Sequence, residues 1–284
     1  MDSLISTDWL AGSLATPGLV ILDATYFLPE LGRDARAEYD AGHIPGALFL
    51  DLATLVDDIS PLPNTLPAAD LVAMRLNDLG VGAGDRIVLY DNSPHRTAPR
   101  AWYVLRLNGI HDVAVLDGGF AKWLADGLPV ERTPVASPTP PTSPLPVRVE
   151  AAGVRSLAQM KANVDSRAEQ VVDARGAGRF TGEEPEIRPG MPSGHIPGAR
   201  NLPYGRLFNA DGSWKRDEAL AAEFEAAGID LSRPLVTTCG SGITASVLLF
   251  GAHLLGKQDI ALYDGSWSEW AIDPSTPKAT GPAA

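Results

Sequence analysis

The sequence predicts an α/β fold of two tandem domains, each a parallel β-sheet flanked by helices. Short runs rich in β-branched residues alternate with segments whose apolar residues recur at helical spacing, which is typical of a parallel sheet covered on both faces. The chain also matches itself at an offset of about 150 residues. A length of 284 residues and a hydrophobic content of 45% suit two globular domains.

Four landmarks occur in the same order in both halves, and the clearest is the hexapeptide Gly-His-Ile-Pro-Gly-Ala. A strand-like run that ends in Asp-Ala precedes each copy, and a second strand-like run and a Trp-containing segment follow it. The paired segments are 20–24 and 171–174, 42–47 and 194–199, 87–91 and 235–239, and 116–123 and 263–270. Four matches in one order indicate a duplication.

Each element follows from its local pattern. The β-branched runs predict strands at Val20–Leu22, Ile87–Tyr90, Val113–Leu116, Val171–Val172, Leu235–Thr238 and Ile260–Tyr263. Apolar spacing predicts helices at Leu71–Leu79, Ala98–Leu107, Ala219–Ala227 and Thr244–Leu255. We expect Trp267 and Trp270 to pack a short helix onto the core. Ligands of such sheets bind at the carboxyl ends of strands, beside helix N-termini.

Proline content marks the boundary between the halves. Six prolines lie between residues 131 and 147, and proline fixes φ and removes a backbone donor. We therefore expect an N-terminal domain over 1–132, a Pro-rich linker over 133–150 and a C-terminal domain over 151–284. The tail after Asp273 is also Pro-rich, and we expect it to fray.

Composition excludes several classes of function. The net charge of −12 provides no basic field for nucleic acid or anionic membranes, so we expect neither as a partner. We see no targeting signal or membrane-spanning run, and we expect a cytoplasmic protein. A single cysteine excludes an internal disulfide and a multi-thiolate metal site. We expect no metal and no cofactor.

That cysteine, Cys239, opens the segment Cys-Gly-Ser-Gly-Ile-Thr-Ala (239–245) between a predicted strand and an apolar helix. Two glycines in three residues let successive N–H groups point inward, and the helix N-terminus adds to their field. Such a loop binds anions and favours a thiolate. A buried structural cysteine is the simpler interpretation, but this context favours a nucleophile.

Together these features resemble the two-domain sulfurtransferases of the rhodanese superfamily, over roughly residues 5–272. The loop 239–245 is similar to that of the 3-mercaptopyruvate sulfurtransferase branch, as are 31–36, 178–180 and 183–188. Members that use thiosulfate typically carry basic residues directly after the cysteine, and this loop has none.

The resemblance implies a double displacement. The Cys239 thiolate attacks the sulfur of 3-mercaptopyruvate, pyruvate leaves, and a persulfide remains. A small thiol, reduced thioredoxin or cyanide then takes the outer sulfur. Arg179 and Arg188 are expected to bind the substrate carboxylate and keto group. We also expect four loop residues, whose N–H groups form the anion cradle, to bind the substrate: Gly240, Gly242, Ile243 and Thr244.

For members of this family, a proton relay through a loop serine, a histidine and an aspartate has been proposed. Ser241 matches the serine, and His43 with Asp34 are the candidate partners. We expect His195, the second copy of His43, to stabilise its turn. The first half has Asp91 where the second has Cys239. A carboxylate cannot carry a transferable sulfur, so we expect the first domain to be catalytically silent.

Three alternatives stay open. The first is a thiosulfate sulfurtransferase, because such enzymes often accept both donors. The second is a cysteine phosphatase of similar fold, which is disfavoured because its loop needs an arginine that 239–246 lacks. The third is a non-enzymatic interaction module, although only the first copy is degenerate.

Overall fold

The computed structural model describes residues 1–133, 135, 138–149, 151–188 and 190–283. The chain divides into two compact units. Unit 1 comprises Met1–Asp58, Leu66–Glu150 and Asn209–Trp214, and unit 2 comprises Ile59–Thr65, Ala151–Phe208 and Lys215–Ala284. Each predicted domain is one continuous stretch of chain. In the structure, the segment Ile59–Thr65 of the first half belongs to unit 2, and Asn209–Trp214 of the second half belongs to unit 1. Residues 134, 136–137 and 150 of the predicted linker lie outside the described residues.

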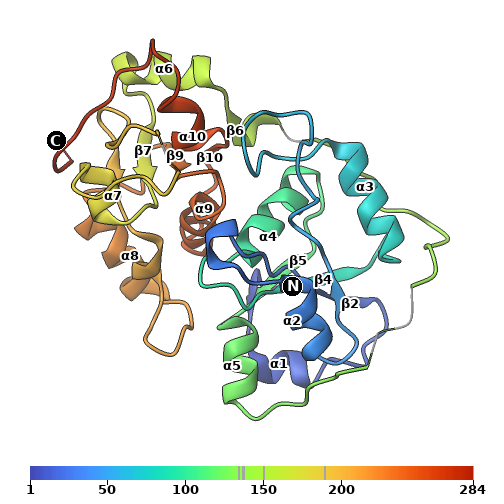
Figure 1. Ribbon diagram of the computed structural model, residues 1–284. Helices are drawn as coiled ribbons and strands as arrows, with labels where there is room; N and C mark the ends of the chain where they lie inside the picture. The colour runs from blue at the N-terminus through green and yellow to red at the C-terminus, as the bar shows by residue number, and fades with distance from the viewer. Residues whose placement is uncertain (134, 136–137, 150, 189, 284) are drawn as a thin grey trace. The chain divides into compact units, whose positions relative to one another are not determined.

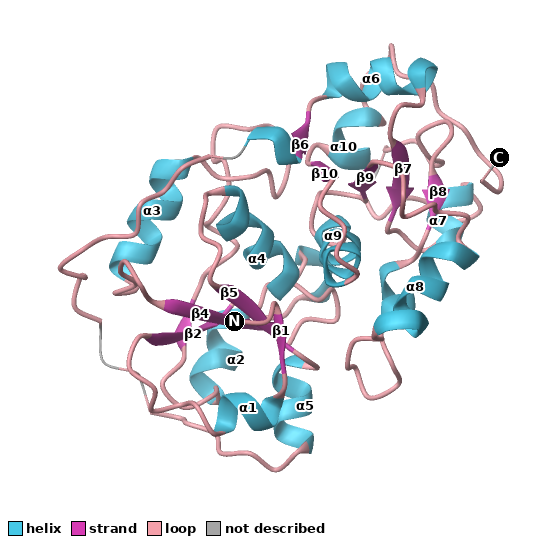
Figure 2. Ribbon diagram, turned by 180° about the vertical axis from the view of Figure 1, so that it is seen from behind, coloured by secondary structure: helices cyan, strands magenta, loops and turns pink. Residues whose placement is uncertain are grey.

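Unit 1 contains a five-stranded parallel sheet in the order β1-β5-β4-β2-β3. Its strands are β1 (Leu4–Ile5), β2 (Leu19–Asp23), β3 (Leu48–Phe49), β4 (Arg86–Tyr90) and β5 (Val113–Leu116). Its helices are α1 (Thr7–Ala11), η1 (Pro29–Leu31), α2 (Ala35–Ala41), α3 (Ala69–Asp78), α4 (Ala98–Leu107) and α5 (Gly119–Ala125). Figure 2 shows α1, α2 and α5 on one face of this sheet and α4 on the other.

Unit 2 repeats this topology with the order β6-β10-β9-β7-β8, again all parallel. Its strands are β6 (Val154–Arg155), β7 (Gln170–Asp173), β8 (Arg200–Asn201), β9 (Leu235–Thr238) and β10 (Ile260–Tyr263). Its helices are η2 (Ala151–Gly153), α6 (Leu157–Ser166), α7 (Ala177–Thr181), η3 (Tyr204–Leu207), α8 (Asp217–Ala226), α9 (Ala245–Leu254) and α10 (Ser266–Trp270) (Figure 1). The identical strand order supports the duplication.

Strand alternation places the core. In β4, Val88 and Tyr90 join the apolar cluster that also holds Trp123 of α5. The equivalent cluster of unit 2 contains Trp267 and Trp270, both buried. The second face of each sheet is covered by an apolar helix, α4 or α9, as their near-continuous burial shows. The predicted α/β class and the packing of the two tryptophans are confirmed.

All six predicted strands and all four predicted helices are present, with ends within two residues of the prediction. No sequence pattern predicts the edge strands β1, β3, β6 and β8, because each has two residues and therefore no measurable period. None of the helices in the described part of the chain has the length and apolar character needed to cross a bilayer.

The prediction that the C-terminal tail frays is wrong. The backbones of Ala279 and His195 exchange two hydrogen bonds of 2.8 and 3.0 Å, and Gly281 N–H donates to Thr181 at 2.8 Å. Thr276 is buried. Proline excludes helix and central strand, but it does not prevent an extended segment from pairing at isolated positions.

Candidate active site

Cys239 directly follows β9 and is 2% exposed. The Gly242 N–H donates to Sγ at 3.1 Å, and Gly242 has a φ of 83° that favours glycine. The helix α9 begins at Ala245, after Ile243 and Thr244, which are both buried. An N–H···S contact strengthens when the sulfur is negative. This local geometry agrees with the anion-binding loop expected from the glycine spacing.

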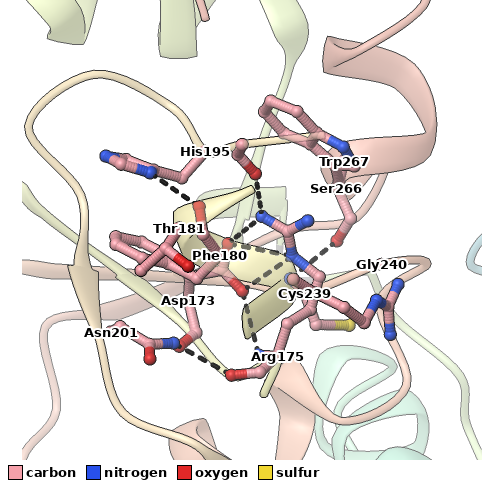
Figure 3. Close-up of polar contacts among 12 residues, drawn as sticks. Asp173, Arg175, Phe180, Thr181, His195, Asn201, Cys239, Gly240, Ser266 and Trp267 are labelled. Carbon is pink, nitrogen blue, oxygen red and sulfur yellow. Dashed lines mark hydrogen bonds and ion pairs between the residues drawn. The ribbon is translucent and has the colours of Figure 1, made fainter. Parts of the chain in front are cut away.

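Ser266 supports the backbone of the cysteine. Its Oγ accepts the Cys239 N–H at 3.2 Å (Figure 3). The same hydroxyl donates to the Tyr263 carbonyl at 2.9 Å. Ser266 is fully buried and has a φ of 52°, a left-handed conformation that is costly for a serine. The Trp267 N–H donates to the Cys239 carbonyl at 3.0 Å. The start of α10 therefore holds Cys239 through both of its backbone polar groups.

Arg179, in the middle of α7, is held by Glu186. Its Nε and Nη2 both donate to Glu186 Oε2, and Glu186 Oε1 accepts from the buried Arg175. A Cβ built on Gly240 would lie 3.2 Å from Arg179 Nη2. The guanidinium of Arg179 thus lies beside the residue that follows the cysteine, and a side chain at position 240 would crowd it. The sequence places this charge on a separate segment and so misses its approach to the loop.

Arg188 reaches the same residue through a serine. Arg188 Nη1 donates to Ser268 Oγ at 2.7 Å, and the Ser268 hydroxyl and N–H both donate to the Gly240 carbonyl. Both arginines assigned to the substrate are therefore anchored around Gly240. Nothing in the sequence pattern singles out Ser268 or Glu186 for these roles. The partners of Ser268 come from distant segments, and those of Glu186 lie 7 and 11 residues away without a recognisable period.

Ser241 has a partner that the sequence did not suggest. Asn64 Nδ2 donates to Ser241 Oγ at 2.9 Å. Asn64 belongs to the segment Ile59–Thr65 of unit 2 and has a φ of 58°, which asparagine tolerates better than most residues. A neutral amide neither gains nor loses a proton near pH 7, so this contact orients the hydroxyl without ionising it. Asn64 comes from the first half of the sequence, far from the loop.

His43 and Asp34 lie in unit 1 with structural contacts. His43 is buried, its Nδ1 contacts the Tyr39 carbonyl at 2.9 Å, and its ring stacks on Tyr39 at 4.1 Å. Asp34 accepts the Ala37 N–H at 3.0 Å and caps α2. These contacts give both residues a local role, and their part in proton transfer stays a prediction.

His195 has the same surroundings as His43. Its Nδ1 contacts the Phe180 carbonyl at 2.9 Å, its ring stacks on Phe180 at 3.8 Å, and burial lowers the pKa of the imidazole. Each histidine also pairs with a distant backbone segment, Glu131 or Ala279. This arrangement favours the neutral, turn-stabilising role expected for His195.

Asp91 occupies the position of Cys239 in unit 1. Its carboxylate accepts the Ser93 N–H at 2.9 Å and the Ala98 N–H at 2.8 Å. The backbone parallel is close, because Phe120 N–H donates to the Asp91 carbonyl at 2.9 Å, as Trp267 does for Cys239. The loop N–H groups that would hold a persulfide are here bonded to a carboxylate of the chain.

The sequence matches the model of the rhodanese-like domain twice, over residues 6–126 and 156–273. It is 42% identical to the 3-mercaptopyruvate sulfurtransferases of Rattus norvegicus and Homo sapiens over 274 residues, which are 94% of this chain and 91% of each relative. It is 40% identical to the thiosulfate sulfurtransferase of Cricetulus griseus over 279 residues, again 94% of this chain and 91% of the relative.

Two solved structures are also similar over nearly the whole chain. The Tum1 protein of Saccharomyces cerevisiae superposes with a TM-score of 0.90 at 29% identity, covering 99% of both chains. SseA from Escherichia coli, described as a 3-mercaptopyruvate sulfotransferase with the rhodanese fold, superposes with a TM-score of 0.84 at 35% identity, covering 95% of this chain and 100% of the other. These matches confirm the resemblance stated above: the chain belongs to the rhodanese family and carries one rhodanese-like domain in each half.

Proposed function

We propose that this protein moves the sulfur of 3-mercaptopyruvate through a persulfide on Cys239 to a thiophilic acceptor and releases pyruvate. The observation that carries the proposal is the convergence of Arg179 and Arg188 on Gly240, beside the only thiol of the chain. The names of relatives that are 42% identical support the same donor.

Binding of the donor uses the two anchored arginines. A guanidinium carries five N–H donors in one plane, and the contacts with Glu186 and Ser268 use only some of them. The remaining donors suit the carboxylate and keto oxygen of a 2-oxo acid. Because Glu186 and Ser268 hold both forks in advance, little side-chain entropy is lost when the substrate binds.

Sulfur transfer then needs one bond to form and one to break. The Cys239 thiolate attacks the substrate sulfur, and the electron pair of the C–S bond passes to the enolate of pyruvate, which takes up one proton. The loop N–H groups of 240–244 stabilise the anionic sulfur. A second thiolate attacks the outer sulfur and restores Cys239. We propose Ser241 as the residue that donates a hydrogen bond to the donor or the persulfide.

Mass spectrometry of the intact protein tests this directly. Incubation with 3-mercaptopyruvate and no acceptor should add one sulfur, which cyanide then removes. Cys239→Ser should neither gain the sulfur nor turn over, because a hydroxyl is a poor sulfur nucleophile of nearly the same size. Substantial turnover by Cys239→Ser would exclude the mechanism, and circular dichroism of the variant checks that it is folded.

Thiosulfate is a second candidate donor. Arg179 places a positive charge next to Gly240, where a compact dianion benefits from it. Relatives named thiosulfate sulfurtransferase are 40% identical to this chain. The ratio of kcat/KM for the two donors, measured in one preparation, decides which is preferred.

The acceptor and the compartment complete the proposal. We propose a small thiol or reduced thioredoxin as acceptor, and the cytoplasm as the compartment because Cys239 must stay reduced. An Arabidopsis thaliana relative that is 36% identical carries the name of a mitochondrial protein. Turnover with each acceptor and fractionation of cells that produce this chain test the two points.

A further inference from the structure

Unit 1 contains a cavity of about 260 Å³ at the carboxyl end of β2, between α2 and α5. Carboxyl ends of strands in parallel sheets are the usual ligand sites of such folds. The exposed side chains of Leu124 and Arg132 belong to its wall and mark its opening. Its inner wall contains Asp23, Thr25, Gly42, Asn92 and Phe120.

In unit 2 the corresponding place is filled by the guanidinium of Arg175. Its Nε and Nη2 donate to Asp173 at 3.1 and 2.6 Å, and Nη2 also donates to the Gly194 carbonyl at 2.8 Å (Figure 3). The Trp267 ring covers the guanidinium with 4.8 Å between Cζ and the ring centroid. Glu186 accepts from Nη1. The side chain of Arg175 is 1% exposed.

The two places correspond in backbone contacts as well as in sequence. Asp23 and Asp173 each end a strand and accept the N–H of the residue two positions later, Thr25 at 2.8 Å and Arg175 at 2.9 Å. Thr25 is therefore the counterpart of Arg175, and it carries no guanidinium.

The rest of the wall follows the same correspondence. Gly42 precedes His43 as Gly194 precedes His195, within the repeated hexapeptide. Phe120 donates its N–H to the Asp91 carbonyl, as Trp267 does to Cys239. The carboxylate, the glycine and the aromatic ring of the unit 2 cage thus have counterparts in unit 1, and all three counterparts line the cavity.

The charges around the cavity favour a cation at its inner end. Asp23 is 4% exposed, and its carboxylate is bonded to the N–H and hydroxyl of Thr25 and to the Tyr90 hydroxyl, all neutral groups. Burial raises the pKa of Asp23 to about 6, still below neutral pH. Among the described residues no cation pairs with Asp23, whereas its counterpart Asp173 is paired with Arg175. Phe120 offers the aromatic surface on which guanidinium groups stack.

The other charged groups at the cavity lie nearer its opening. Glu38 also lines the wall and is paired with Arg33 at 2.6 Å, and Arg132 is exposed. The buried Asp91 adds to the negative potential around Asp23, whereas burial raises the pKa of Tyr39 to about 12, so its phenol is neutral near pH 7. A guanidinium at the inner end would therefore face the Asp23 carboxylate.

We propose that this cavity of unit 1 binds a guanidinium group, supplied by a free guanidino compound or by an arginine side chain of a peptide, in the place that Arg175 fills in unit 2. The site would give the copy that lacks the cysteine a binding function of its own. It depends neither on Cys239 nor on the identity of the sulfur donor.

Titration of the intact protein with methylguanidinium tests the proposal, with methylurea as a neutral probe of nearly the same shape. Methylguanidinium should bind saturably in the millimolar range, and methylurea at least about tenfold more weakly, since a charged hydrogen bond contributes about 1.5–3 kcal/mol. Shifts of the amide NMR signals of Thr25, Gly42 and Phe120 locate the binding. Equal binding of both probes, or no saturable binding, would overturn the proposal.

Two variants test the site independently of each other. Asp23→Asn should weaken the binding of methylguanidinium at least about tenfold. Circular dichroism is the control for folding of this variant. Thr25→Arg should abolish binding and raise Tm, because it supplies the guanidinium from the chain, as unit 2 does. Retained binding in Thr25→Arg contradicts the site even if Asp23→Asn does not fold.

A blocked arginine peptide and agmatine distinguish the two sources. Tighter binding of the peptide supports a protein side chain as the ligand, and tighter binding of agmatine supports a free compound. If neither the peptide nor agmatine displaces methylguanidinium from the protein, the assignment of this cavity is overturned.

Discussion

At the scale of single residues, Ser268 shows how one hydroxyl organises a site. It accepts from Arg188 and donates to the Gly240 carbonyl, so it fixes the position of the Arg188 guanidinium relative to the cysteine loop. Glu186 does the same for Arg179. Each arginine is thus oriented by a hydrogen-bonded neighbour, Ser268 for Arg188 and Glu186 for Arg179.

Replacement of the arginines should weaken productive binding of 3-mercaptopyruvate. Arg188→Ala or Arg179→Ala removes charged hydrogen bonds of about 1.5–3 kcal/mol, so kcat/KM should fall about 10- to 150-fold. Arg188→Lys is the matched control, because it keeps the charge and loses the planar fork. Steady-state kinetics with the pyruvate released as readout measure the effect. Unchanged kinetics in both alanine variants would place the substrate elsewhere.

Asp23 should make the stability of unit 1 depend on pH. Burial raises its pKa from 3.8 to about 6 in the folded state. Its contribution to stability is therefore complete below about pH 4 and is lost as the pH rises through about 6, up to roughly 3 kcal/mol.

Asp23→Asn removes this titration and serves as the reference. Urea unfolding between pH 4 and pH 7 should show the wild type losing stability relative to the variant as pH rises. The buried Asp91, whose pKa burial also raises, is present in both proteins, so the difference between them reports on Asp23 and its repulsion with Asp91. Parallel stability curves would show that Asp23 does not titrate in this range.

At the scale of elements, strand ends and helix starts create the reactive loop. Cys239 directly follows β9, and the Gly242 N–H of the next turn donates to its sulfur. The first residues of α10 bond the backbone of Cys239. The left-handed Ser266 shows that the first residue of α10 is under strain, where the first residue of α5 in unit 1 is Gly119 with a φ of 58°. A serine in that place adds a hydroxyl that bonds the cysteine backbone, which a glycine cannot do.

The charge of this loop should control donor choice. We expect kcat/KM to favour 3-mercaptopyruvate over thiosulfate by at least about tenfold, a difference of roughly 1.4 kcal/mol. Ser241→Lys places an ammonium near the sulfur. Because thiosulfate is a dianion and releases the anion sulfite, this charge should shift the ratio of kcat/KM toward thiosulfate.

Ser241→Ala is the control for this change. Both variants lose the contact with Asn64, so only the lysine effect beyond alanine reports on charge. The substitution at 241 is preferable to Gly240→Arg, because a Cβ at 240 would crowd Arg179. A wild type that prefers thiosulfate contradicts the donor assignment. An unmoved ratio in Ser241→Lys rejects loop charge as its cause.

At the scale of the whole molecule, duplication has produced two copies with one topology and different loops. Unit 1 keeps the sheet order and the turn histidine of unit 2. Its loop position holds Asp91, whose carboxylate bonds to N–H groups of its own chain, and its arginine position holds Thr25. One copy therefore has the elements of a reactive site, and the other has an open cavity.

Asp91→Asn should leave sulfur transfer close to that of the wild type. The amide oxygen can still accept one of the two loop N–H groups that the carboxylate accepts. Loss of the other hydrogen bond should lower the stability of unit 1 and leave turnover unchanged. Steady-state rates with 3-mercaptopyruvate measure it, with Cys239→Ser as the inactive reference. A drop of about a hundredfold, roughly 2.7 kcal/mol of transition-state stabilisation, would show that unit 1 takes part in the chemistry.

Periodicity and the repeated motifs were sufficient to predict the α/β class, the duplication, the central strands and helices, and the nucleophile candidate Cys239. These features depend on neighbouring residues or on self-similarity, which a single sequence records directly. The resemblance added the assignment of Arg179 and Arg188, and the structure adds that both are anchored beside Gly240.

The tertiary structure alone revealed the partners that come from distant segments. Asn64 beside Ser241, Ser268 beneath Arg188, the pairing of the tail with His195, and the cavity left by Thr25 all join residues far apart in the chain. Such contacts leave no local period or motif, because each depends on how loops of different elements meet in space. For the same reason the two-residue edge strands and the exchange of short segments between the units could not be predicted from the sequence.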